Sequence, residues 1–252
     1  MAKNKKQIAF VVYPGVPPLD LVGTHYPLAG LRTKGYQPLV VAENLEPVDT
    51  DTPLKIFPQK TFAELPRPAG IVVMGGDLGG LQALTDEALL GYLRTAGESA
   101  EFVASVGEGS LILASAGLLK NRQGTTHWAY ASILESLGVE YVPRRFVEDG
   151  KFFTAAGVTA GVDMGLYMVS KLAGAKQARF SQLWAEYDPH PPLGGINWES
   201  LDREALKPLF LPKEEQLRKI FADHPDLLQK LLQAIRQPAR VDVEEHTYVQ
   251  PQ

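Results

Sequence analysis

Short apolar runs alternate with segments of helical periodicity through the first half of the chain, and this alternation limits the possible folds more than any other feature. Such a pattern is typical of a parallel sheet covered by helices on both faces. We expect buried strands at residues 7–13, 36–42, 69–74 and 101–106. We expect helices at residues 19–33, 86–98, 110–119 and 127–137. The sequence therefore predicts an α/β fold with a mostly parallel central sheet.

The character of the chain changes after residue 198. Residues 201–235 are rich in Leu, Lys and Glu, and three prolines divide them into two or three short amphipathic helices. We expect an α/β domain over residues 1–198, a helical C-terminal appendage over 199–236 and a mobile tail over 237–252. The simplest interpretation of the appendage is a pair of surface helices without chemistry, and the alternative is a dimerisation arm.

Charge and composition exclude several classes of function. The chain of 252 residues has a formal net charge of −4, which does not favour nucleic-acid binding. Its first apolar run is too short for a signal sequence or a membrane span, so we expect a cytoplasmic protein without a membrane partner. Cysteine is absent, which excludes disulfides and thiolate chemistry. No His, Asp and Glu spacing indicates a metal site, and no glycine pattern indicates a cofactor, so we expect neither.

Ligands of open α/β sheets bind beyond the carboxyl ends of the strands, so the loops at these ends are the candidate site. Asp20 lies in the first turn of the helix after the first strand, where an acid is commonly no more than a partner of the helix dipole. Gly75 and Gly76 follow the third strand. Such a pair can present backbone N–H groups to an anion or oxyanion, although it also forms plain turns.

The loop after the fourth strand has the form of a nucleophile elbow, because a strand runs through a tight turn into an apolar helix. Gly107 is its apex, and Glu108 and Gly109 follow. His127 and Trp128 lie further along the chain. A single histidine is more often structural than catalytic, and aromatic side chains more often pack in a core than line a site. His25, on the first helix, is a further candidate to line the site.

Several segments, taken in order, carry a family resemblance. They are Tyr-Pro-Gly-Val-x-Pro-Leu-Asp, Gly-Gly, Ser-Leu-Ile-Leu-Ala-Ser-Ala-Gly-Leu-Leu, Thr-Thr-His-Trp, Phe-Thr-Ala-Ala-Gly-Val-Thr-Ala-Gly-Val-Asp and Glu-Tyr-Asp-Pro-x-Pro-Pro. Through them, residues 7–195 resemble the isonitrile hydratase branch of the ThiJ/PfpI superfamily, which is class I glutamine amidotransferase-like. The resemblance implies a flavodoxin-like sandwich that forms a homodimer. It also implies an acid at Asp20, the elbow at Gly107 and a histidine at His127.

The chain departs from this family at the elbow. The family has a nucleophilic cysteine where this chain has Gly107, and usually a threonine where it has Glu108. Glycine cannot attack an isonitrile carbon, so we expect no cysteine-type isonitrile hydration. If Glu108 points toward Asp20, repulsion between the two charges would raise one pKa and leave one acid and one base near neutral pH.

We therefore expect a cysteine-independent lyase of the hydratase or cyclase type that acts on a small organic molecule. Its catalytic residues would be Asp20, Glu108 and His127. The residues expected to bind the substrate are Gly75, Gly76, Gly107, Gly109, Trp128 and His25. The alternative is a non-catalytic pseudoenzyme of the isonitrile hydratase family that binds a small molecule.

Overall fold

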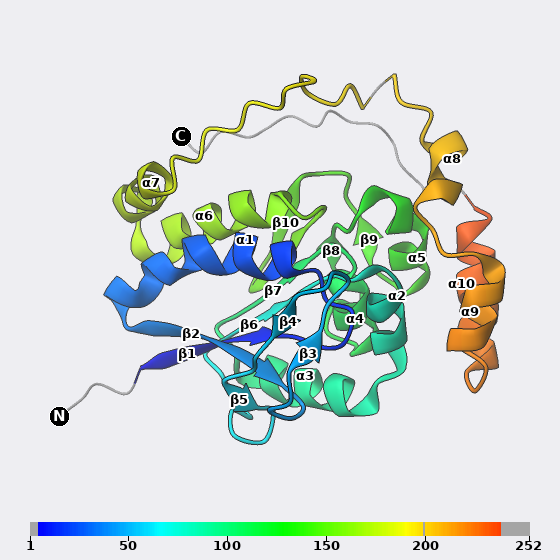
Figure 1. Ribbon diagram of the computed structural model, residues 1–252, viewed down its shortest axis with the longest axis horizontal. Helices are drawn as coiled ribbons and strands as arrows, with labels where there is room; N and C mark the ends of the chain where they lie inside the picture. Colours follow the sequence, from blue (N-terminus) through cyan, green and yellow to red (C-terminus); the bar gives the residue numbers. More distant parts are fainter. Residues whose placement is uncertain (1–4, 199, 238–252) are drawn as a thin grey trace.

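The computed structural model describes residues 5–198 and 200–237, and its centre is a seven-stranded sheet (Figure 1). The strand order is β10-β11-β7-β6-β1-β2-β5. All neighbouring strands are parallel except β10, which is antiparallel to β11. The strands are β1 (Lys6–Val11), β2 (Tyr36–Ala42), β5 (Lys60–Thr61), β6 (Gly70–Val73), β7 (Phe102–Val106), β10 (Phe146–Asp149) and β11 (Phe152–Ala155). The predicted α/β fold with a mostly parallel sheet is confirmed.

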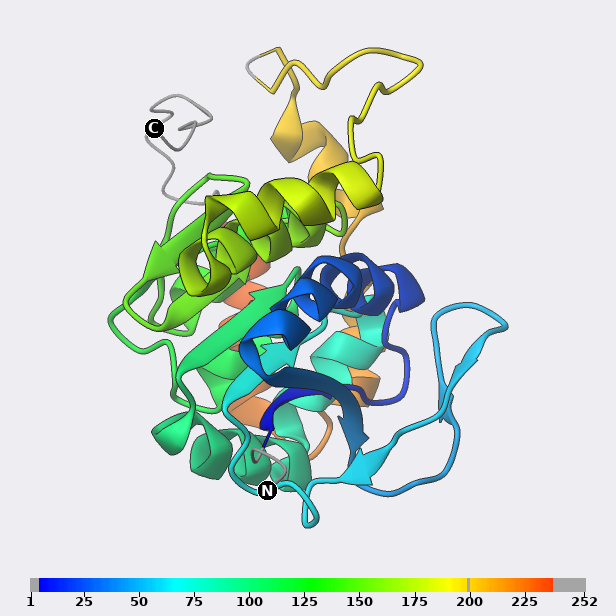
Figure 2. The same ribbon diagram turned by 90° about the vertical axis from the view of Figure 1, so that its left-hand side faces the viewer.

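Helices cover both faces of this sheet (Figure 2). One layer contains α1 (Pro18–Leu28), η1 (Ala29–Lys34), α6 (Ala160–Ala173) and α7 (Ala175–Trp184). The other contains α2 (Asp77–Gln82), η2 (Ala83–Thr85), α3 (Glu87–Ser99), α4 (Gly109–Ser115), η3 (Trp128–Tyr130) and α5 (Ala131–Ser136). Along β1, Ile8 and Phe10 belong to the core beneath α1 and α6, while Ala9 and Val11 belong to the opposite core. Apolar residues on both faces of a strand explain why the central strands read as continuous apolar runs.

Local side-chain contacts explain where two helices differ from the predicted ranges. The helix predicted from residue 86 begins at Glu87, because the Asp86 side chain accepts a hydrogen bond from the Leu89 N–H (3.0 Å) and acts as the N-cap. The helix predicted from residue 127 begins with a 3₁₀ turn, at which the His127 ring accepts from the Ala129 N–H (3.4 Å). Both ends are thus fixed by side chains that accept from the first turn.

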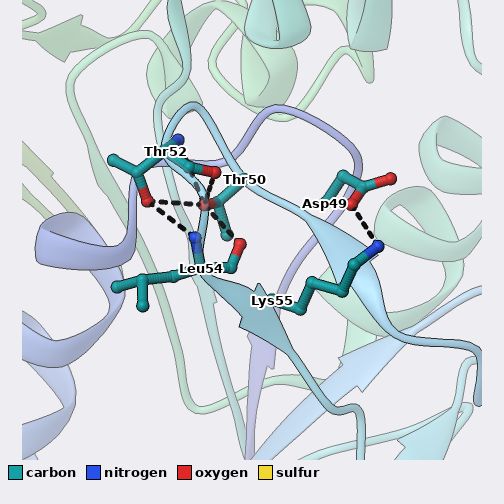
Figure 3. A network of polar contacts seen from close by, with 5 residues as sticks. All are labelled: Asp49, Thr50, Thr52, Leu54 and Lys55. Atoms are coloured by element: carbon teal, nitrogen blue, oxygen red, sulfur yellow. Dashed lines mark hydrogen bonds and ion pairs between the residues drawn. The ribbon is translucent and has the colours of Figure 1, made fainter.

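A hairpin of β3 (Val48–Asp49) and β4 (Lys55–Ile56) projects from the sheet on the β2 and β5 side (Figure 2). Polar contacts of its own residues fix its turn: the Thr50 hydroxyl lies 2.8 Å from the Leu54 carbonyl oxygen, and Lys55 forms an ion pair with Asp49 (Figure 3). The Gly15 N–H donates to the Asp49 carbonyl oxygen at 2.8 Å. The hairpin therefore braces the loop between β1 and α1.

Four short helices follow residue 200. They are α8 (Arg203–Leu206), η4 (Lys207–Leu209), α9 (Glu214–Ile220) and α10 (Pro225–Ile235). Of these, α10 packs against α5, and α9 and α10 contribute to the core beside it. Leu217, Phe221, Leu231 and Ala234 are buried in the same apolar cluster as Ile133 and Leu134 of α5. A long segment links α7 to α8 across the molecule (Figure 1). Residues 238–252, which make up almost all of the predicted tail, lie outside the described residues.

Across residues 5–198 and 200–237, no helix is both long enough and apolar enough to cross a bilayer.

A small parallel pair of strands, β8 (Gln123–Gly124) and β9 (Glu140–Tyr141), lies beside the main sheet. Its position brings the segment before His127 close to β11, since the Thr125 N–H donates to the Thr154 hydroxyl at 2.8 Å.

The packing of the appendage predicts its resistance to proteolysis. In the native protein, limited proteolysis followed by mass spectrometry should leave residues 201–235 intact. Phe221→Ala should lower the free energy of unfolding by about 3–5 kcal/mol and open this segment to cleavage, because Phe221 is fully buried. Leu209→Ala, at a largely exposed position, is the control and should change neither property. Cleavage throughout 201–235 in the native protein would contradict this packing.

Candidate functional site

Three loops meet at the carboxyl ends of β1, β6 and β7, which are neighbours in the order β7-β6-β1. The loop after β1 leads to Asp20, the third residue of α1. The loop after β6 carries Gly75 and Gly76, and the loop after β7 carries Gly107 and Glu108 immediately before α4. Because the strands are parallel and adjacent, their loops lie at one edge of the sheet, where ligands of open α/β sheets bind.

Two carboxylates of these loops converge on Gly75. Asp20 is only 2% exposed, and its Oδ2 accepts from the Gly75 N–H at 3.0 Å. Glu108 Oε2 accepts from the Gly76 N–H at 3.3 Å. A Cβ atom on Gly75 would lie 2.7 Å from Glu108 Oε2 and 2.9 Å from Asp20 Oδ2. Both side chains therefore crowd the same backbone position, which only glycine can occupy without displacing them.

The Gly75–Gly76 amides were expected to bind an anion or oxyanion, and in the structure the chain's own carboxylates take them. The opposite side of this loop is held by Tyr13, whose hydroxyl lies within hydrogen-bonding distance of the Met74 and Gly75 carbonyl oxygens. Tyr13 was not among the residues predicted for the site. Its only signal in the sequence was its position at the end of the first apolar run.

The environment of the pair favours the retention of protons. Burial raises the pKa of Asp20 to about 7, the negative charge of Glu108 adds to this effect, and the Gly75 N–H opposes it. Burial also raises the pKa of Glu108, while its own backbone N–H and that of Gly76 oppose the shift. Asp20 Oδ1 is buried and has no hydrogen-bond partner among the described residues. Two interacting acids of this kind titrate as a pair, with one proton held near neutral pH.

Gly107 has the positive φ of an elbow apex, +52°. A Cβ atom at this position would have its nearest neighbours, Asp20 Oδ2 and the Gly75 Cα, at 3.9 Å, so there is room for a side chain beside Asp20. The Gly107 carbonyl oxygen accepts from the hydroxyls of Ser110 (3.0 Å) and Thr126 (3.1 Å). The elbow geometry is thus preserved without the nucleophile.

Gly109 has a structural role in the fold. A Cβ atom there would lie 2.3 Å from the Val73 carbonyl oxygen, so glycine permits the close approach of α4 to the end of β6. This approach places Glu108 above the loop that follows β6.

His127 lies beside a group of polar residues that includes Tyr130 and Asp77. Its Nδ1 accepts from the Ala129 N–H, which leaves the proton of the neutral ring on Nε2. Burial lowers the pKa of His127, and the charge of Asp77 opposes this shift. The Tyr130 hydroxyl donates to Asp77 Oδ1 at 2.7 Å, and the ring of Tyr130 lies 6.2 Å from that of His127. Asp77 directly follows Gly76, so these residues connect His127 to the Glu108 loop.

The two remaining candidates lie in different surroundings. His25 packs edge-on against Phe10 with the ring centres 4.9 Å apart, and burial lowers its pKa. The described contacts of His25 include neither carboxylate of the pair. Trp128 packs against His127 and against Phe210 of the appendage. Phe210 had no signal in the sequence, because only the docked fold brings it to this place. Within the described residues, no group of three or more His, Asp or Glu side chains could hold a metal ion.

The fold and the site define a doubly wound α/β protein whose elbow, with glycine at its apex, faces a buried carboxylate. Residues 6–171 match the DJ-1/PfpI family, and the chain belongs to that family. An isonitrile hydratase from Pseudomonas putida is 41% identical to this chain over 186 residues, which are 74% of this chain and 80% of that protein. The resemblance inferred from the motifs is confirmed, and the chain has no cysteine.

Solved structures agree with this assignment. A ThiJ/PfpI family protein from Pseudomonas syringae superimposes with a TM-score of 0.74 at 34% identity, over 93% of this chain and 92% of that one. Drosophila melanogaster DJ-1beta superimposes with a TM-score of 0.66 at 18% identity, over 74% of this chain and 100% of that one, which shows a shared fold.

The raised pKa of Asp20 predicts a pH dependence of stability. Folding shifts the pKa of this group from 3.8 to about 7, so ionisation opposes folding. The resulting cost is absent below about pH 4, grows as the pH rises toward 7 and is constant above it. Asp20→Asn should therefore raise the free energy of unfolding relative to the native protein by roughly 1–4 kcal/mol above pH 7, and by less near pH 4.

The measurement is denaturant unfolding of both proteins across this pH range. Asp223→Asn makes the same chemical change at an exposed position and serves as the control. A difference between Asp20→Asn and the native protein that is the same at pH 4 and pH 8 would show that Asp20 ionises normally.

Proposed function

We propose that this chain is a lyase of the hydratase or cyclase type that works without a cysteine nucleophile on a small organic molecule. Membership of the DJ-1/PfpI family and the similarity to an isonitrile hydratase support a hydratase-type reaction. The observation that carries the proposal is the convergence of Asp20 and Glu108 on Gly75, with the pKa of Asp20 raised to about 7. Such a pair supplies a general acid and a general base at neutral pH.

The surroundings of the two groups assign their roles. Asp20 is the more deeply buried acid with a single N–H partner, so it carries the proton. Glu108 has N–H donors from its own backbone and from Gly76, which favour its anionic form. In hydration, Glu108 removes a proton from water as the water oxygen bonds to an electrophilic carbon of the substrate. Asp20 gives its proton to the neighbouring substrate atom.

The same pair accounts for the related reactions. After hydration, Glu108 holds a proton taken from the attacking water, and the product holds the proton that Asp20 gave up. Proton exchange with solvent then returns both groups to their starting states. The reverse sequence eliminates water, and an internal hydroxyl or amine in place of water closes a ring. His127, with its proton on Nε2, can donate a hydrogen bond that orients the substrate.

The departure at the elbow separates this proposal from the name of the Pseudomonas putida relative. Family resemblance implies attack by a cysteine there, whereas Gly107 supplies no side chain. We therefore propose a reaction without a covalent intermediate. Simple alkyl isonitriles should not be turned over by a cysteine route.

Turnover tests the carboxylate pair. Small-molecule extracts incubated with the protein in water labelled with heavy oxygen should yield a compound that gains or loses one water, or a ring-closed isomer, detected by mass spectrometry. With that compound as substrate, Glu108→Gln and Asp20→Asn should each reduce kcat by about 10² or more, the usual scale for general acid–base groups. Asp223→Asn should leave kcat unchanged.

The binding alternative gives a different pattern. If no compound is converted and NMR titration finds ordinary pKa values for both carboxyls, the catalytic proposal is wrong and a non-catalytic binding protein is favoured. If a compound is converted but neither substitution slows it, the pair is not the acid and base.

A homodimer is the assembly that the surface supports. Large apolar side chains are exposed along α1 and the neighbouring α7, where they lie outside the core of the protein. They are Leu19, Val22 and Tyr26 of α1 and Phe180, Leu183 and Trp184 of α7. Large apolar side chains exposed on two neighbouring helices favour protein–protein contact. We propose that a second copy covers it.

Substitution of this surface tests the dimer. The native protein should sediment as a dimer in analytical ultracentrifugation, and the double variant Val22→Glu with Leu183→Glu should sediment as a monomer, because it would bury four charges in the interface. Leu209→Glu, on the exposed side of η4, is the control and should remain dimeric. A monomeric native protein, or a dimeric double variant, would contradict the proposed interface.

A further inference from the structure

The C-terminal appendage reaches the candidate site through Phe210. The Phe210 ring centre lies 5.7 Å from that of His127 and 5.1 Å from that of Trp128. Phe210 follows η4 directly, so it comes from a segment far from the elbow in sequence. The rings of His127, Trp128 and Phe210 contact one another, and we call these three residues the aromatic cluster.

A chain of contacts joins this cluster to the carboxylate pair. The Tyr130 hydroxyl lies 3.4 Å from the Phe210 carbonyl oxygen and donates to Asp77 at 2.7 Å. Asp77 is bonded in sequence to Gly76, whose N–H donates to Glu108. The cluster is therefore connected to the carboxylate pair through Tyr130, Asp77 and Gly76.

A buried lysine fixes the appendage at this place. Lys207 of η4 is 6% exposed, and its ammonium donates to the Ser132 hydroxyl of α5 (3.2 Å) and to the Gln237 carbonyl oxygen (3.0 Å). Burial of an ammonium group costs free energy that these hydrogen bonds must offset. The contact ties η4 both to the core and to the end of α10. Phe210, three residues further along, is held in register with His127.

The rings of the cluster are incompletely covered. Phe210 is 47% exposed, and His127 and Trp128 are half-buried. Partly exposed aromatic faces beside a buried acid pair can gain contact area with a flat apolar group, while the polar end of the same molecule reaches the carboxylates.

We propose that Phe210 is a specificity-determining residue, which with Trp128 receives a flat apolar substituent of the substrate. Lys207 is its positioning residue. The substrate class is therefore a small molecule with a polar reacting end and an aromatic or similarly flat apolar end. This inference rests on the proposed function, because it places the reacting end at Asp20 and Glu108.

Three neutral amides of increasing apolar size test it by direct binding. Formamide, N-butylformamide and N-phenylformamide share an N–H donor suited to a carboxylate and differ in their substituent. Affinities come from NMR titration of the His127 and Trp128 ring resonances in the full-length protein. N-phenylformamide should bind at least tenfold more tightly than formamide, since burial of an aromatic ring contributes about 1.5–3 kcal/mol and tenfold corresponds to about 1.4 kcal/mol.

Substitutions at η4 then separate the roles. Phe210→Ala should reduce the ratio of N-phenylformamide to formamide affinity about tenfold and leave formamide binding unchanged. Lys207→Met should reduce the same ratio, because η4 is released from Ser132. Leu209→Ala, next to Phe210 and 77% exposed, should keep the native ratio, and Phe210→Tyr should largely preserve it.

The outcomes distinguish this inference from the proposed function. An unchanged ratio in Phe210→Ala, or no binding of N-phenylformamide to the native protein, would overturn the role of Phe210, whatever the turnover assay shows. A ratio that depends on Phe210 would support it even if no compound is converted, in which case the catalytic proposal alone would fail.

Discussion

The arrangement of the site depends on two consecutive backbone amides that hold two carboxylates. Gly75 donates to Asp20 and Gly76 donates to Glu108, so acids from two other loops are tied to one turn. The sheet order makes this possible, because β1 and β7 flank β6. Amide donors of this kind stabilise negative charge, whereas burial opposes it. The balance raises the pKa of both acids, an effect that neither loop could create alone.

The change from the family pattern at the elbow involves two coupled positions. Gly107 leaves open the space beside Asp20 that a side chain would fill. Glu108 meanwhile occupies the Gly76 amide, which in a site without this carboxylate would be available to a substrate oxygen. The loss of the nucleophile and the gain of the carboxylate therefore affect the same small region beside Asp20 and Gly76. Under the proposed function, the chemistry that remains is proton transfer between the acid–base pair and the substrate.

The sequence predicted those features that arise from local pattern. Residues 36–42 form β2 with the predicted bounds because an apolar run between turns is a local signal. The common edge of the sheet and the family resemblance placed the loops of Asp20 and Glu108 at one site, whereas the direction of the Glu108 side chain was left open. Strands β10 and β11 were not predicted: each has only four residues, and they join the sheet through the pairing of β11 with β7, which is distant in sequence. Tyr13 and Phe210 were missed for the same reason: their contacts with the site exist only after tertiary packing.

Docking of the appendage connects stability to selectivity. Phe221 and Leu217 are buried in the same core as α5, and this packing holds η4, from which Phe210 projects toward His127. A specificity residue on a free segment would lose conformational entropy when it closed on a substrate, and this loss would weaken binding. Here the folding of the appendage has already restricted that segment. The entropy cost of ordering Phe210 is thus part of the free energy of folding. It does not reduce the free energy that the ring gains on contact with a substrate.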